Sequence, residues 1–247
     1  MNSQQILSLP SMPAIGPSYP RGPYRFIDRE YFIIIYESDQ DAIAEIVPEP
    51  LLLDDENLVN FEWIRMPDSS GFGSYMESGC VIPCRFKGEP CNYVVQMYLD
   101  NEPPISAGRE IWGFPKKFGL PKLEVVGDTL TGTLDYAGQR VATGTMGYKH
   151  CDLSGSEKSI LAALTKTQVN LKLIPGVDGN PIIAQLAAYN LSDVVFKGAW
   201  SGPARLHLIP HANAPVADLP VKKVLEGRHI IADLTLPYGR VLHDYLD

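Results

Sequence analysis

The chain has 247 residues, 45% of them hydrophobic and 20% charged, and its formal net charge is −8. This composition is typical of a globular protein with a sizeable core, and the acidic balance argues against a nucleic-acid partner. No apolar run approaches the length of a membrane span, and the N-terminus lacks the basic and apolar segments of a signal peptide. We therefore expect a cytoplasmic protein with no membrane partner.

The N-terminal third begins with a proline-rich segment. Residues 1–23 hold five of the 21 prolines, which predicts an extended arm rather than a helix, able to lie over a neighbouring subunit. The run 31–37 (YFIIIYE) predicts a buried strand, and Ser38 is the expected N-cap of a short helix that ends before Pro48. Residues 58–66 alternate as a strand, which places Glu62 on one face with Leu58 and Ile64. An inward carboxylate at Glu62 would need a partner.

The rest of the chain reads as short strands with few helices. A helix is predicted over residues 157–166 and another after Pro220. Strands are predicted over residues 74–82, 92–99, several segments within 123–148, then 169–174, 182–189, 193–199, 204–209, 229–236 and 240–245. This pattern indicates a mainly β, α+β protein, one domain over residues 1–247, built on a large antiparallel sheet or barrel.

The cysteines do not form a usual zinc pattern. Cys80, Cys84 and Cys91 have C-x3-C-x6-C spacing, and the fourth cysteine, Cys151, lies far from them in sequence. We expect reduced thiols and no metal site.

Residues 110–122 read EIWGFPKKFGLPK and set three lysines among aromatic and apolar side chains. Taken alone, such a stretch is most often a surface turn with solvated lysines. Loss of water lowers the pKa of a lysine, and the neutral amine forms a Schiff base with a ketone without any cofactor. Because adjacent residues of a strand point to opposite faces, we expect only one of Lys116 and Lys117 to be desolvated. The other should point to solvent or pair with a carboxylate.

The segment EIWGFPKKFGLPKL resembles the lysine signature of the acetoacetate decarboxylase family. Other segments also resemble that family, in the expected order: RGPYRFIDREYF from Arg21, YMESG from Tyr75, MYLDNEP from Met97, VATGTMGYKH from Val141 and WSGP from Trp200. Together they span nearly the whole chain, which is far more specific than one lysine motif.

This resemblance implies a fold, an assembly and an activity. The expected fold is a closed, cone-like β-barrel with a few peripheral helices and the reactive lysine inside, assembled as a large homo-oligomer, typically a dodecamer. The expected reaction converts acetoacetate, a small β-keto acid, to acetone and carbon dioxide through a lysine Schiff base, with no cofactor. Acetoacetate decarboxylase is itself a standard example of a lysine activated by desolvation or by a neighbouring cation. The sequence pattern alone shows neither barrel closure nor subunit number.

The resemblance also assigns residues. Lys116, the first of the lysine pair, aligns with the Schiff-base lysine, although composition does not choose between it and Lys117. Arg29, Glu62 and Glu77 align with an arginine and two acids of the family's active site. An arginine can hold a carboxylate through paired hydrogen bonds. Glu77 could position the substrate, transfer a proton or repel the substrate carboxylate, and the sequence leaves this open.

Two apolar residues, Met97 and Phe26, are candidates to line the pocket, and core packing explains them equally well. Two other functions are compatible with the chain. One is a Schiff-base aldolase or dehydratase acting on another keto acid with the same scaffold. The other is a non-catalytic ligand-binding barrel, which predicts an unperturbed lysine and no covalent adduct.

Overall fold

The computed structural model describes residues 1–247. Four α-helices are present, together with a π-helical turn, η1 (Gly108–Trp112), and two 3-10 turns, η2 (Ser154–Ser156) and η3 (Val216–Asp218). The α-helices are α1 (Ser3–Leu7), α2 (Gln40–Ile46), α3 (Glu102–Ala107) and α4 (Glu157–Leu164). The strands are β1 (Tyr24–Glu37), β2 (Leu52–Leu53), β3 (Leu58–Met66), β4 (Asp68–Ser69), β5 (Tyr75–Phe86), β6 (Glu89–Leu99), β7 (Lys116–Phe118), β8 (Leu120–Val126), β9 (Thr129–Tyr136), β10 (Gln139–Gly147), β11 (Cys151–Asp152), β12 (Thr167–Pro175), β13 (Pro181–Tyr189), β14 (Ser192–Gly202), β15 (Ala204–Leu208), β16 (Lys223–Leu236) and β17 (Arg240–Asp244).

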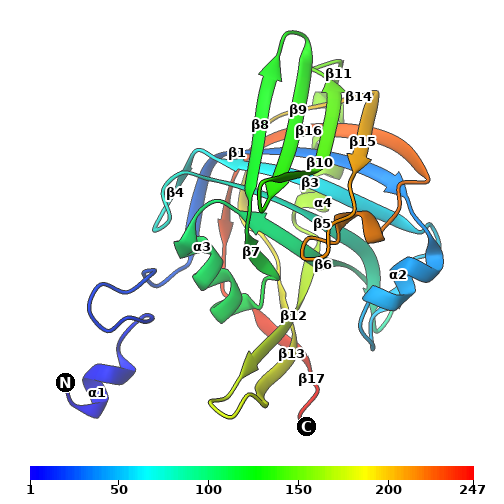
Figure 1. Ribbon diagram of the computed structural model, residues 1–247. Coiled ribbons are helices and arrows are strands. Elements are labelled where there is room, and N and C mark those ends of the chain that lie inside the picture. Colours follow the sequence, from blue (N-terminus) through cyan, green and yellow to red (C-terminus); the bar gives the residue numbers. More distant parts are fainter.

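The strands form two sheets (Figure 1). The larger has 13 strands, ten of them in the order β11-β14-β16-β1-β3-β5-β6-β12-β13-β17. The other three lie off this path, where β2 pairs with β5, β4 with β1 and β7 with β6. The smaller has four strands in the order β15-β10-β9-β8. The mainly β, α+β class expected from the sequence is therefore confirmed.

The closed, cone-like barrel implied by the resemblance is wrong for this structure. β11 pairs only with β14, and β17 pairs only with β13, so the two ends of the large sheet do not join. A barrel requires a continuous ladder between its first and last strands. These end strands have only two and five residues, which leaves few backbone groups for such a ladder. The sheet is also not wholly antiparallel, because β6 pairs in parallel with both β7 and β12.

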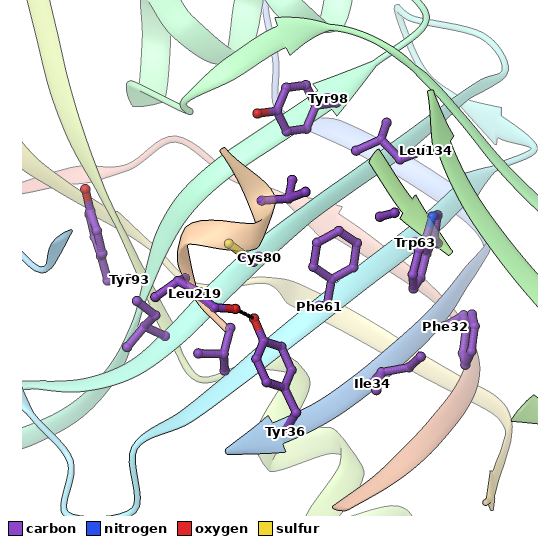
Figure 2. Close-up of a cluster of buried hydrophobic side chains, with 14 of the residues drawn as sticks. Phe32, Ile34, Tyr36, Phe61, Trp63, Cys80, Tyr93, Tyr98, Leu134 and Leu219 are labelled. Atoms are coloured by element: carbon purple, nitrogen blue, oxygen red, sulfur yellow. Dashed lines mark hydrogen bonds between the residues drawn. The ribbon is translucent and has the colours of Figure 1, made fainter. Parts of the chain in front are cut away.

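The large sheet is buried on both faces at its centre. Figure 2 shows one of its two core clusters, where Phe32 and Ile34 of β1 and Phe61 of β3 point toward Leu134 of β9, in the small sheet. Trp63 lies in the same cluster, and a Cβ atom on Gly144 of β10 would come within 2.5 Å of its ring. The backbone of β10 therefore approaches the indole closely at a position where only glycine fits. The second cluster lies around the opposite face of β1, with Tyr24, Phe26 and Tyr31 among its members.

A bulge in β1 changes which side chains reach that opposite face. The register with β16 shifts between Phe26 and Arg29, and Asp28 in this bulge has a φ of 53°. A bulge adds one residue and turns the side chains that follow it. Phe26 and Arg29, three positions apart, consequently line the same cavity.

Three local predictions differ from the structure. The N-terminal arm contains the helix α1, which begins with a reciprocal capping box between Asn2 and Gln5. The N-cap of α2 is Asp39 rather than Ser38, because the Asp39 side chain accepts hydrogen bonds from two backbone N–H groups. The segment after Pro220 is part of β16 instead of a helix, since pairing with β1 satisfies its backbone. The structure has no helix of the length and apolar character needed to cross a bilayer.

Candidate active site

A cavity of about 240 Å³ lies on the face of the large sheet opposite the cluster of Figure 2. Its walls come from β1, β3, β5, β6 and β16, and it is completed by residues before and within β7, at the end of α4, at the start of β12 and at the end of β13. Six of the residues selected from the sequence line it: Phe26, Arg29, Glu62, Glu77, Met97 and Lys116.

Strand register brings these residues together. Glu62 of β3 lies opposite Gly79 of β5, Gly79 lies opposite Met97 of β6, and Met97 lies opposite Lys116 of β7. These four residues form one row across the sheet, and Glu77 is two positions from Gly79 on the same face. A Cβ atom on Gly79 would lie 2.2 Å from the backbone carbonyl oxygen of Gln96, so only glycine fits at position 79.

Lys116 is buried beside a carboxylate. Only 5% of the residue is exposed, and its Nζ lies 3.2 Å from Oε2 of Glu77, which is also buried. The ammonium lies 4.8 Å from the ring centroid of Phe114. A backbone hydrogen bond from Met97 to Pro115 and a 3.1 Å bond from Arg109 to the Lys116 carbonyl oxygen hold the strand in place.

The turn that precedes Lys116 is held from distant parts of the chain. The π-helical turn η1 ends at Gly113, whose φ of 71° favours glycine. Asn170 donates a hydrogen bond to the carbonyl oxygen of Trp112, and Lys172 donates to that of Ile111. The Trp112 indole donates to the carbonyl oxygen of Pro237, at 3.0 Å. These bonds fix the backbone from which Lys116 enters the cavity.

Burial lowers the pKa of Lys116 below its ordinary value. The charge on Arg29 acts in the same direction, while the Glu77 carboxylate opposes both through charge and a hydrogen bond. Desolvation is the largest of these effects, as expected from the aromatic and apolar stretch around this lysine.

Burial also raises the pKa of Glu62, to about 7, against the opposing charge of Arg29 and with a smaller raising contribution from Glu77. Glu62 consequently keeps its proton to near neutral pH, whereas Arg29 is charged and its pKa is raised by Tyr31 and Glu77 against the effect of burial. The cavity therefore contains a lysine poised to lose a proton and a carboxyl group poised to keep one. Groups with opposed shifts of this kind are typical of catalytic sites.

Lys117 lies outside the cavity. Its side chain is exposed, its Nζ donates to the carbonyl oxygen of Asn213, and it lies 5.1 Å from the ring centroid of Tyr136. Adjacent residues of β7 thus point to opposite sides, as their strand geometry requires. Lys122 is also exposed, so these two lysines contribute no charge within the cavity.

Three tyrosines of the cavity were not selected from the sequence: Tyr31, Tyr75 and Tyr189. Tyr31 follows Arg29 by two positions in β1, so a shared face was readable from the strand period. Its buried hydroxyl and the Nε of Arg29 have no hydrogen-bond partner in the protein, and both residues line the cavity. Burial raises the pKa of Tyr31 to about 12, so the phenol stays protonated and can donate.

A desolvated lysine in a cavity that also holds an arginine and two carboxyl groups is the arrangement expected of a Schiff-base-forming enzyme. No group of three or more His, Cys, Asp or Glu side chains in the structure is arranged to hold a metal ion. The profile of the family described as acetoacetate decarboxylase (ADC) matches residues 11–246. The chain belongs to the acetoacetate decarboxylase family.

The chain is also similar to individual acetoacetate decarboxylases in sequence and in structure. The acetoacetate decarboxylase of Acidiphilium cryptum (strain JF-5) is 58% identical over 236 residues, which cover 96% of this chain and 95% of the relative. A solved structure described as "Structural Studies of Acetoacetate Decarboxylase" is 48% identical with a TM-score of 0.96, over 100% of both chains. The crystal structure of acetoacetate decarboxylase from Legionella pneumophila is 50% identical with a TM-score of 0.92, over 97% of this chain and 94% of the other.

Proposed function

We propose that this enzyme decarboxylates acetoacetate to acetone and carbon dioxide, with Lys116 as the residue that forms the Schiff base. The observation that carries this proposal is the buried ammonium of Lys116, 3.2 Å from Glu77, in a cavity that also holds Arg29. Membership of the family supports the reaction, and the lowered pKa of Lys116 supports the choice of nucleophile.

The first steps need a neutral amine. A deprotonated Lys116 attacks the ketone carbon of acetoacetate, and loss of water gives an iminium ion. The bond between the carboxylate carbon and its neighbour then breaks, carbon dioxide leaves, and the electron pair moves into an enamine. Protonation of the enamine carbon and hydrolysis of the imine release acetone and restore the amine.

Arg29 is the candidate that binds the substrate carboxylate. Its Nε and the Tyr31 hydroxyl are buried donors of the cavity without a partner in the protein. A charged fork and a phenol suit a carboxylate, and a bidentate contact fixes its orientation. This contact would hold the scissile bond in a set direction relative to the iminium.

The two acids receive different roles. Glu77 contacts the Lys116 ammonium, so it is the group that accepts the proton when the amine is released. Glu62 has a raised pKa of about 7 and holds a proton near neutral pH, so it is the candidate that donates to the enamine carbon. Met97 and Phe26 supply apolar surface that keeps water from the iminium.

Reduction with borohydride during turnover tests the proposal. The expected result is a reduced three-carbon adduct on Lys116, located by peptide mass mapping, because carbon dioxide is lost before the imine is hydrolysed. The Lys117→Gln variant is the matched control and should give the same adduct. An adduct on Lys117 would overturn the residue assignment. Intact acetoacetate without any adduct would overturn the reaction and favour another keto acid or a binding protein.

We further infer that residues 1–247 act as one domain that assembles into a homo-oligomer, with a dodecamer as the expected form. The support is an N-terminal arm with exposed apolar side chains, which extends from the body of the protein in Figure 1: Ile6, Leu7, Met12 and Ile15. Deletion of residues 1–18 should reduce the mass measured by analytical ultracentrifugation. A monomer at micromolar concentration of the full chain would contradict this inference.

The cytoplasm is the proposed location. All four cysteines are free, including Cys84 and Cys91, which lie directly opposite each other in β5 and β6. Reduced thiols in such close positions are typical of a reducing compartment. Thiol counting on protein purified without reductant checks this, and a Cys84–Cys91 disulfide would contradict it.

A further inference from the structure

The cavity continues along the strands well beyond the reactive lysine. From the row that holds Glu62 and Met97, its wall extends to Ile35 of β1, Asn60 of β3 and Pro83 of β5. It ends between β6 and β12, where Asn92 lies opposite Gln168. Met97 and Asn92 are five positions apart in β6, which corresponds to about 17 Å at about 3.3 Å per residue.

This distant end is in contact with solvent through Ala163. Lys116, Glu77 and Tyr189, around the reaction centre, are buried. At the other end Asn92 and Gln168 are only half-buried, and Ala163 of α4 is exposed. Entry from this end would carry a substrate along the sheet to Lys116.

Lys166 stands at this entrance, between α4 and β12, and lines the cavity. Its backbone is fixed on both sides, since its N–H donates to Ala163 and its carbonyl oxygen accepts from the Gln168 side chain at 3.2 Å. Its half-buried ammonium takes part in none of the structure's ion pairs. A second cation that lines the cavity, Arg228, lies opposite Ile33 in the row of Glu62 and is paired with Glu226 at 2.7 Å.

We propose that Lys166 is a binding residue of the entrance, which attracts the substrate carboxylate into the cavity of this acidic protein. The inference rests on the proposed decarboxylation of acetoacetate, an anion that a net charge of −8 repels at long range. An unpaired cation at this end of the cavity reverses that repulsion locally. Lys166 does not touch the reacting atoms, so its contribution is to KM.

The size of the effect follows from the distance. With the strand length of about 17 Å between Asn92 and Met97 taken as the separation of the charges, and an effective dielectric constant of about 20, removal of one charge changes the binding of a unit anion about fivefold. Lys166→Gln should raise KM for acetoacetate about fivefold at low salt and leave kcat unchanged. Lys166→Glu should raise KM about 25-fold, and Lys166→Arg should restore it. The differences should shrink as the ionic strength rises, because the entrance is partly solvated.

The matched control is Lys158→Gln, which removes the same charge from an exposed position of α4 outside the cavity. Its KM should stay within twofold of the wild-type value. An equal change for both variants, a lowered kcat with constant KM, or no change for Lys166→Glu would overturn the proposal. Melting temperatures of all variants show whether a change in KM comes from loss of folding.

A binding measurement separates this proposal from the proposed reaction. Calorimetry with acetoacetate compares a Lys116→Gln protein with a Lys116→Gln, Lys166→Gln double variant, neither of which needs to turn over substrate. Weaker binding by the double variant supports the entrance role even where the assigned nucleophile is wrong. Equal binding by the two proteins overturns the entrance role while leaving decarboxylation at Lys116 intact.

Discussion

Replacement of Gly108 by alanine should disable Lys116 while the protein still folds. Gly108 begins the π-helical turn η1, directly beneath the lysine side chain. A Cβ atom there would lie 2.7 Å from Cδ and 3.0 Å from Cε of Lys116, and 3.1 Å from a ring carbon of Phe114. Ordinary carbon–carbon contacts are about 3.5–4.0 Å. The lysine stem must therefore move by about 1 Å.

That displacement sets the expected loss of activity. A misplacement of about 1 Å at a reacting group costs about a hundredfold in rate. The atoms that must move belong mainly to a flexible side chain, so the cost in stability should stay within the range of about 1–3 kcal/mol for overpacking. We expect kcat to fall about a hundredfold, with a folded protein at the assay temperature.

Steady-state decarboxylation, the rate of borohydride trapping and the melting temperature measure these effects. Gly155→Ala is the matched control, since a Cβ atom at Gly155 would meet nothing within 4 Å. It should behave as the wild type in all three assays. A Gly108→Ala enzyme with kcat within about threefold of the wild type would refute the argument that the position of the Lys116 stem limits the reaction.

Three further substitutions test the remaining groups of the site. Arg29→Gln should raise KM about 10- to 100-fold, because a charged hydrogen bond contributes about 1.5–3 kcal/mol; an unchanged KM in steady-state assays would argue that another group binds the carboxylate. Lys117→Gln should keep most activity and the same acid limb of the pH–rate profile, since Lys117 is exposed and lies outside the cavity; a thousandfold loss would contradict this. The raised pKa of Glu62, about 7, means that the folded state holds this proton more tightly than the unfolded chain. Its stabilising effect is complete below about pH 4 and is lost as pH rises through 7, so wild type should lose about 3 kcal/mol more than Glu62→Gln between pH 4 and 8. Parallel curves of unfolding free energy against pH would rule this out.

The sequence predicted the strands that build the site because their patterns are local. The β-branched run 31–37 lies within β1, and the alternation over residues 58–66 matches β3, with Glu62 facing inward among apolar neighbours. The segment after Pro220 misled because its pattern fits a helix as well as a strand, and only pairing of Val224 with Tyr36 of β1 decides between them. Sheet closure was equally out of reach, since it depends on whether two distant end strands meet.

The residues of the site also fall into those that local sequence predicts and those that only the tertiary fold brings together. The burial of Lys116 could be predicted because its neighbours in sequence are aromatic. That Lys117 points away from Lys116 follows from the alternation of side chains along a strand. Tyr75 and Tyr189 carried no signal, since a tyrosine in a strand is most often a core residue and their approach to Arg29 is made by the tertiary fold. Resemblance to the family supplied Arg29 and Glu77, for which spacing alone gave no reason.

The bonds that hold the turn before Lys116 have a consequence for the timing of synthesis. Three of its anchors, Asn170, Lys172 and Pro237, are translated after the lysine itself, the last of them near the C-terminus. A ribosome-bound chain thus carries Lys116 on an unanchored segment, where water keeps its amine protonated and unreactive toward ketones. The turn that places Lys116 in the cavity is therefore fully anchored only once almost the entire polypeptide has been made.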